Sequence, residues 1–158
     1  RRTFGLSARK EDTFIGGLSM GGFGSIHTGL KYPETFGKIF GLSSALIIHN
    51  ICGMKPGDVS GFSDYEYYHR TFGDLDRLKD SENNPEYVID RRIKAGEHIQ
   101  PIFMACGTED FLLKENRAFK DFLTERNLDV TYLEDTGKHD WEFWGKCIEP
   151  AVKWAVEE

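Results

Sequence analysis

The chain has 158 residues, of which 39% are hydrophobic and 13% aromatic, and this content is enough to bury one sizeable core. Its formal net charge of −6 comes without a lysine or arginine cluster, which argues against a nucleic-acid partner or an anionic membrane surface. No apolar run reaches the length of a membrane span, and residues 1–14 contain no apolar segment of the kind that a signal peptide needs. We therefore expect one globular domain with no nucleic-acid and no membrane partner.

The hydrophobic pattern predicts strands alternating with helices from the start of the chain. Residues 13–17 are a short β-prone run, and residues 21–32 keep helical spacing until Pro33. Residues 38–46 form a second apolar strand candidate. The polar and aromatic stretch at about 49–84 has no clear period, and we expect it to be an excursion over the functional face of the domain.

The second half of the chain continues the same alternation. Residues 85–97 predict a helix with proline in its first turn, and residues 101–107 predict a buried, nearly all-apolar strand. An amphipathic helix at 114–127, a strand at 129–135 and a closing helix at 141–158 follow. Such alternation implies parallel strands joined by right-handed crossovers, so the predicted fold class is α/β, a mainly parallel sheet flanked by helices.

Three cysteines, Cys52, Cys106 and Cys147, stand at wide spacing, without the paired pattern of a zinc site or the density of a disulfide-stapled fold. We interpret them as reduced intracellular thiols, mostly in the core, and expect a cytoplasmic protein. Cys106 ends a predicted strand, but with no neighbouring histidine a buried, inert thiol is the expectation.

A G-x-S-x-G pentapeptide, Gly17 to Gly21, lies at the first predicted strand-to-helix junction. This context is that of a nucleophile elbow, a sharp turn that lifts a serine clear of the sheet. Glycine at Gly17 and Gly21 would remove collisions where strand and helix crowd together. Ser19 is then the candidate nucleophile, and the backbone N–H of Met20, at a helix N-terminus, is the candidate oxyanion donor.

The pentapeptide alone is a weak signal, because a chain with 17 glycines contains it by chance in roughly one case in ten. A passive serine in a glycine-rich turn is the alternative. A serine nucleophile also needs a base and an orienting carboxylate, expected in the order serine, acid, histidine. Asp110 follows one predicted strand and His139 follows the next, at the sheet edge where catalytic groups collect. Glu109 competes with Asp110, whereas Asp140 is expected to cap the last helix.

The other histidines carry no predicted function. No spacing typical of a metal site connects them, so we expect neither a metal nor a cofactor. They are His27, His49, His69 and His98.

Three segments together resemble a known family: residues 14–37, 103–123 and 130–144. They are similar to the signature regions of the esterase D type of α/β-hydrolase, which includes S-formylglutathione hydrolases, tributyrin esterases, feruloyl and acetyl esterases, and mycolyltransferases. The likeness is strongest to bacterial tributyrin-esterase-like proteins and spans nearly all of the chain, from Phe14 to Trp154. The resemblance implies the same triad, with Ser19 as nucleophile, Asp110 as acid and His139 as base.

One departure from the family concerns length, because α/β-hydrolases place several strands before the nucleophile and this chain places one. We therefore expect residues 1–158 to be the carboxyl-terminal portion of an α/β-hydrolase fold whose amino-terminal half, with the second oxyanion donor, is missing. Expected partners are a small ester substrate and either the missing portion or a second copy of the chain.

The predicted function is that of a serine carboxylesterase, which hydrolyses a small or short-chain acyl ester of tributyrin, acetyl, feruloyl or S-formylglutathione type through an acyl-enzyme. An acyltransferase with the same triad and a non-catalytic fragment are the alternatives. Aromatic residues of the excursion are expected to line or cover the pocket for the acyl group or the alcohol: Phe62, Tyr65, Tyr67, Tyr68 and Phe72.

Overall fold

Four parallel strands form the main sheet in the computed structural model, which describes residues 2–157. In the order in which they pair, they are β1 (Phe14–Leu18), β2 (Lys38–Leu42), β5 (Ile102–Gly107) and β6 (Val130–Asp135). The register aligns Ile15, Ile39 and Ile102 in one row, and their side chains belong to the main core. All six residues of β5 are buried, as expected for a strand that is covered on both faces. The predicted parallel α/β sheet is confirmed.

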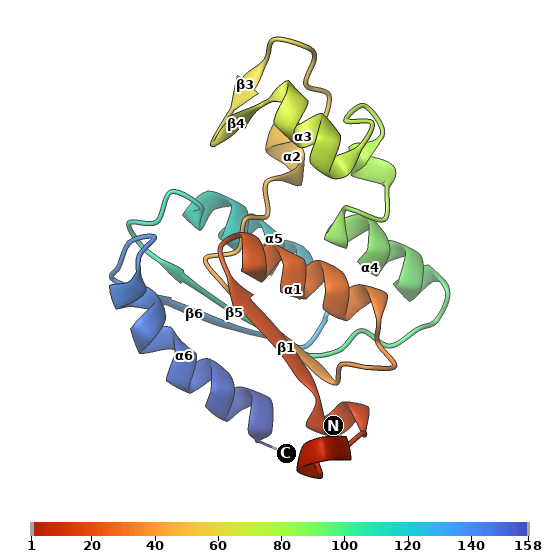
Figure 1. The fold of residues 1–158 in the computed structure, drawn as a ribbon, viewed down its shortest axis with the longest axis vertical. Coiled ribbons are helices and arrows are strands. Elements are labelled where there is room, and N and C mark those ends of the chain that lie inside the picture. The colour runs from red at the N-terminus through yellow and green to blue at the C-terminus, as the bar shows by residue number, and fades with distance from the viewer. Residues whose placement is uncertain (1, 158) are drawn as a thin grey trace.

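Helices cover both faces of this sheet (Figure 1). One face carries α1 (Met20–Lys31), which packs on β1 and β2, and α5 (Leu113–Glu125), which packs on β5 and β6. Helix α4 (Pro85–Lys94) packs against α1, and α6 (Trp141–Val156) covers the opposite face over β2 and β5. No helix among residues 2–157 combines the length and the apolar character that a membrane crossing requires.

The stretch between β2 and α4 rises beyond the carboxyl ends of the strands (Figure 1). It contains α2 (Ile48–Ile51), the short antiparallel pair β3 (Val59–Ser60) and β4 (Ser63–Asp64), α3 (Tyr65–Phe72) and the 3₁₀ turn η3 (Leu78–Asp80). These elements bury a small apolar cluster of their own, so the stretch is more regular than its sequence pattern indicates. Asp64 starts α3 by accepting a hydrogen bond from the Tyr67 N–H.

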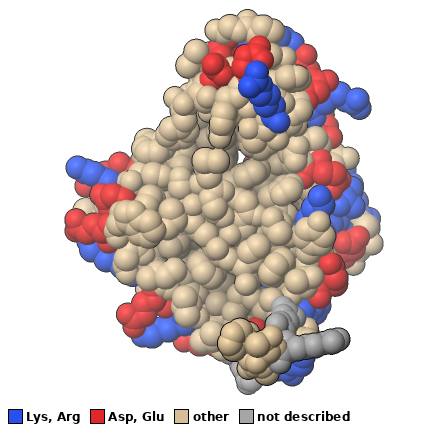
Figure 2. All heavy atoms as spheres, viewed as in Figure 1, with Lys and Arg blue, Asp and Glu red and all other residues tan. Residues whose placement is uncertain are grey.

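Strand β1 is the edge of the described sheet, since only β2 pairs with it. Two 3₁₀ turns, η1 (Arg2–Phe4) and η2 (Lys10–Asp12), precede it. Figure 2 shows the molecule from the side of β1, α1 and α6, and there the charged side chains gather at the periphery around a broad uncharged centre. An edge strand beside such a surface is suited to further pairing.

Candidate active site

Ser19 lies between β1 and α1, in a backbone conformation with φ 55° and ψ −120°. Non-glycine residues rarely adopt a positive φ, and such strain persists where the surroundings over-determine the backbone. Here the turn after β2 fixes Ser19 on both sides: its N–H donates to the Leu42 carbonyl at 2.9 Å, and its carbonyl accepts from the Ala45 N–H at 2.9 Å. The strand–turn–helix context of a nucleophile elbow is therefore present.

Only one of the two glycines of the pentapeptide is sterically required by the described structure. A Cβ at Gly17 would lie 2.4 Å from the Gly21 carbonyl oxygen, which is backbone and cannot move aside. A Cβ at Gly21 would meet nothing within 4 Å. The expectation that both glycines relieve crowding is wrong for Gly21. The Gly21 backbone approaches the position of a Gly17 side chain, whereas the position of a Gly21 side chain is open.

This difference predicts the stability of two matched variants. Gly17→Ala should lower the free energy of unfolding by about 3 kcal/mol, because the added methyl group overpacks the turn. Gly21→Ala, the control, should be neutral or stabilising by up to about 1 kcal/mol, since alanine is the better helix former. Urea unfolding of both variants measures the difference, and equal effects would contradict this reading of the turn.

Asp110 stands in the loop after β5 with a side chain that is completely buried. Its Oδ1 accepts the Leu112 N–H at 2.8 Å, which holds the carboxylate in place. Glu109, the competing acid, points elsewhere: its side chain is 55% exposed and lies 3.9 Å from the Lys138 ammonium. The structure therefore directs Asp110, and not Glu109, toward the histidine.

His139 lies in the loop after β6 and joins the other two residues. Its Nδ1 is 2.9 Å from Asp110 Oδ2, and its Nε2 is 2.9 Å from Ser19 Oγ. A carboxylate can only accept, so Nδ1 carries the proton and Nε2 is free to accept the proton of the serine hydroxyl. Asp140 instead caps α6 by accepting the Phe143 N–H, as predicted.

Sequence reasoning missed Asn116, a fully buried residue in the first turn of α5. Its Oδ1 accepts the Ser44 N–H at 3.1 Å, and its Nδ2 donates to the Ser44 carbonyl at 2.9 Å and to the Leu112 carbonyl at 2.9 Å. It therefore ties the turn beside Ser19 to the loop that carries Asp110. An asparagine on the apolar side of an amphipathic helix is the signal that could have revealed it.

A cavity of about 470 Å³ opens beside Ser19 and Met20 under the excursion. Four of the five aromatic residues that we expect at the substrate pocket line this cavity: Phe62, Tyr67, Tyr68 and Phe72. The fifth, Tyr65, is not part of the wall, and its ring stacks on His69 with the centroids 5.2 Å apart. Phe23 and Ile47 complete the apolar part of the wall.

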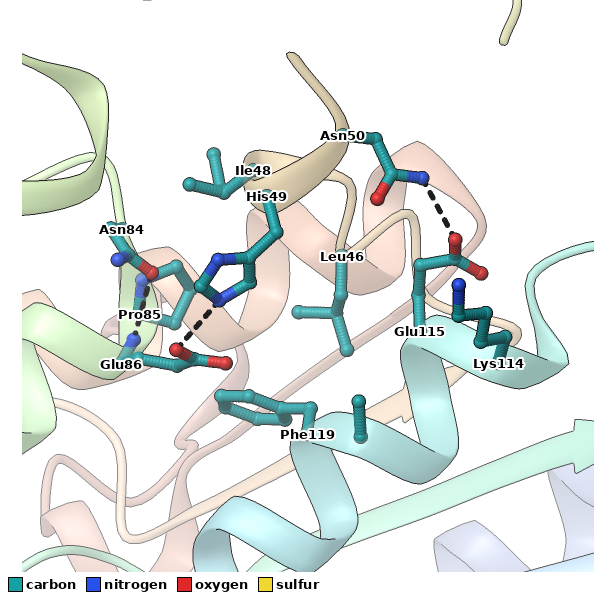
Figure 3. A pocket seen from close by; sticks show the side chains of 11 residues that line it. Leu46, Ile48, His49, Asn50, Asn84, Pro85, Glu86, Lys114, Glu115 and Phe119 are labelled. Carbon is teal, nitrogen blue, oxygen red and sulfur yellow. Dashed lines mark hydrogen bonds and ion pairs between the residues drawn. The ribbon is translucent and has the colours of Figure 1, made fainter. Parts of the chain in front are cut away.

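A second cavity, of about 230 Å³, lies between α2, α4 and α5 and has none of the triad residues in its wall. Figure 3 shows two pairs among its polar side chains: His49 lies 2.8 Å from Glu86, and Asn50 donates to Glu115 at 2.8 Å. Leu46 and Phe119 form its apolar floor. His49 therefore has a side-chain partner on α4.

Burial raises the pKa of the Cys106 thiol to about 12, although a hydrogen bond with Ser43 acts in the opposite direction. The thiol is therefore protonated at neutral pH and is a poor nucleophile. Cys106 and Cys147 are both buried, and Cys52 is half-buried.

Comparisons with known proteins agree with this geometry. Residues 2–155 match the model of the Esterase family, whose description reads "Putative esterase". The chain is 45% identical over 154 residues to an acetyl esterase of Caldicellulosiruptor saccharolyticus, covering 98% of this chain and 58% of that protein. The chain thus spans less than two thirds of this relative's length.

Two solved structures superpose on nearly the whole chain. An S-formylglutathione hydrolase of Staphylococcus aureus superposes with a TM-score of 0.81 at 29% identity, over 99% of this chain and 59% of that chain. The fluorophosphonate-binding serine hydrolase FphF of the same organism gives a TM-score of 0.80 at 30% identity, again over 99% of this chain and 59% of that chain. From the family match, the identity to the acetyl esterase and the α/β-hydrolase fold, we conclude that the chain belongs to the Esterase family.

Proposed function

We propose that the protein is a serine carboxylesterase that hydrolyses small or short-chain acyl esters through an acyl-enzyme. The single observation that carries the proposal is the hydrogen-bonded series Asp110–His139–Ser19, with a strained serine at one end and a buried carboxylate at the other. The family membership and the acetyl esterase relative support the same class of reaction.

The proposed mechanism follows from which atoms can hold the proton. His139 Nε2 takes the Ser19 proton as Oγ attacks the ester carbonyl, and Asp110 stabilises the imidazolium through Nδ1–H. The same proton then passes to the leaving alcohol, and an acyl-enzyme remains on Ser19. Water, activated by His139, attacks the acyl carbonyl and releases the acid and the free serine.

We assign one oxyanion donor to the backbone N–H of Met20. Met20 is the first residue of α1, where N–H groups have no intrahelical acceptor and the helix dipole favours negative charge. A donor at such a position stabilises the tetrahedral oxyanion by about 3 kcal/mol. The side chain of Met20 is 67% exposed, so only its backbone is assigned this role.

The cavity beside Ser19 bears on the substrate class. Its volume of about 470 Å³ is far larger than an acetyl group requires, and its wall is largely aromatic and aliphatic. We therefore propose that the cavity also receives part of the alcohol, and that an apolar or ring-shaped alcohol is preferred over a charged one.

The test of the proposed function is turnover of a series of 4-nitrophenyl esters and of S-formylglutathione. We expect the highest kcat/KM for acetyl to butyryl esters and a decline for longer chains. Product analysis with added methanol separates hydrolysis, in which the free acid dominates, from acyl transfer, in which the methyl ester dominates. A folded protein that turns over none of these esters would contradict the proposal.

We also propose that the uncharged surface over β1, α1 and α6, seen in Figure 2, packs against a further portion of the protein or a second copy. The unpaired edge of β1 and the 58% share of the acetyl esterase's length support this proposal. Light scattering of the chain alone should then report association. A monodisperse, cooperatively melting monomer of 18.1 kDa would contradict it.

A further inference from the structure

Ser43, in the turn directly after β2, has an unusual backbone for a side chain that is fully buried. Its φ is 44°, in the region that glycine occupies without strain. The turn around it holds Ser19: Leu42, directly before Ser43, accepts the Ser19 N–H, and Ala45, two residues after it, donates to the Ser19 carbonyl. A serine that stays strained where glycine would be relaxed points to a use for its hydroxyl.

That hydroxyl accepts a hydrogen bond from the indole of Trp144, with Nε1 and Oγ 3.1 Å apart. Trp144 lies in the first turn of α6, is 8% exposed, and meets the His139 ring edge to face, with the centroids 4.9 Å apart and the planes at 84°. The two ring nitrogens of His139 are engaged by Asp110 and Ser19. Two aromatic rings also pack against the His139 ring, Phe111 with the centroids 4.5 Å apart and the buried indole of Trp144, and both restrain its plane.

The turn that carries Ser43 is itself anchored. The Ser43 N–H donates to the Ala105 carbonyl at 2.7 Å, and Asn116 bonds both the N–H and the carbonyl of Ser44. This turn thus bonds the nucleophile through its backbone, and its Ser43 hydroxyl bonds the Trp144 indole that packs on the His139 ring. The turn after β2 therefore helps to position both Ser19, through its backbone, and His139, through Trp144.

We propose that Ser43 and Trp144 are positioning residues that hold the His139 imidazole at hydrogen-bond distance from Ser19. The inference rests on the proposed function, because it gives both residues a part in the same acyl transfer. Misplacing a reacting group by about 1 Å can cost about 100-fold in rate. Loss of the Ser43–Trp144 hydrogen bond alone, with an aromatic ring still packed on His139, should lower the rate less, by about 10-fold.

The test compares Ser43→Ala, which removes the acceptor, with Trp144→Phe, which removes the donor and keeps an aromatic ring. For hydrolysis of 4-nitrophenyl acetate, each should lower kcat about 10-fold and leave KM within about twofold. The double variant should be no slower than the slower single variant, since both changes break the same bond. Trp154→Phe is the matched control, because Trp154 packs on Phe103 at the far end of α6 and should keep the wild-type kcat.

A second readout does not depend on activity. The Nδ1–H proton that His139 shares with Asp110 is sheltered from water when the ring is fixed, and its ¹H NMR signal should broaden or disappear in Ser43→Ala and Trp144→Phe but persist in Trp154→Phe. If wild-type protein hydrolyses no ester, the proposed function fails, and the signal still tests the positioning role.

Two results would overturn the positioning role. One is wild-type kcat with an unchanged Nδ1–H signal in both single variants. The other is a double variant whose loss equals the product of the two single losses, which would show that Ser43 and Trp144 act independently. Thermal melting of all four variants identifies any loss of activity that comes from unfolding.

Discussion

Replacing Ser19 with alanine should lower kcat for ester hydrolysis by about 10⁶-fold, to the residual rate that binding and the oxyanion donor alone support. The change removes Oγ and with it the hydrogen bond to His139 Nε2 at 2.9 Å. Alanine keeps the same Cβ, so the strain at φ 55° and the fold are unchanged. KM should stay close to its wild-type value, since the cavity wall is otherwise intact.

The control for this variant is Ser7→Ala, an identical substitution at an exposed serine before β1. It should retain full activity. A Ser19→Ala protein with more than about a hundredth of the wild-type kcat would contradict the assigned nucleophile, because a triad without its serine loses far more than that.

Replacing Asp110 with asparagine should lower kcat by about 10⁴-fold through the wrong histidine tautomer. The Leu112 N–H requires an acceptor at the Oδ1 position, so the asparagine oxygen should stay there and its NH₂ group should face His139. Nδ1 must then accept, which places the proton on Nε2. In that tautomer Nε2 cannot take the proton of Ser19.

Glu109→Gln is the matched control, since it neutralises the adjacent carboxylate, which is 55% exposed and faces Lys138. Its kcat should remain within about twofold of wild type, as is usual for an exposed charge. Measured kcat values for the two variants decide between the acids. A large loss in Glu109→Gln with little loss in Asp110→Asn would reverse the assignment.

The order of strands and helices follows from the sequence because each element has a local cause. β5 is apolar throughout since both its faces are covered, and Pro85 and Asp140 mark helix starts by their chemistry. The excursion is harder to predict, because each strand of its hairpin is only two residues long and its helix packs on a small local cluster. Elements that depend on such contacts leave little periodicity in the sequence.

At the site, Ser19, Asp110 and His139 could be proposed from their places after successive strands. The residues that support them could not, because Ser43, Trp144 and Asn116 act across 72 or more positions of sequence separation. The sequence also does not show that Gly21 has room for a side chain, since steric crowding depends on which backbone approaches the turn. The spacing of residues along the chain predicts which catalytic candidates follow each strand, but it does not predict which distant side chains pack against them.

The most direct test of the serine mechanism is labelling with a fluorophosphonate, followed by peptide mapping of the adduct. We expect one adduct, on Ser19, in wild-type protein, a much slower reaction in Asp110→Asn, and no reaction in Ser19→Ala. Equal labelling of wild-type protein and Ser19→Ala, or an adduct mapped to another residue, would contradict Ser19 as the nucleophile.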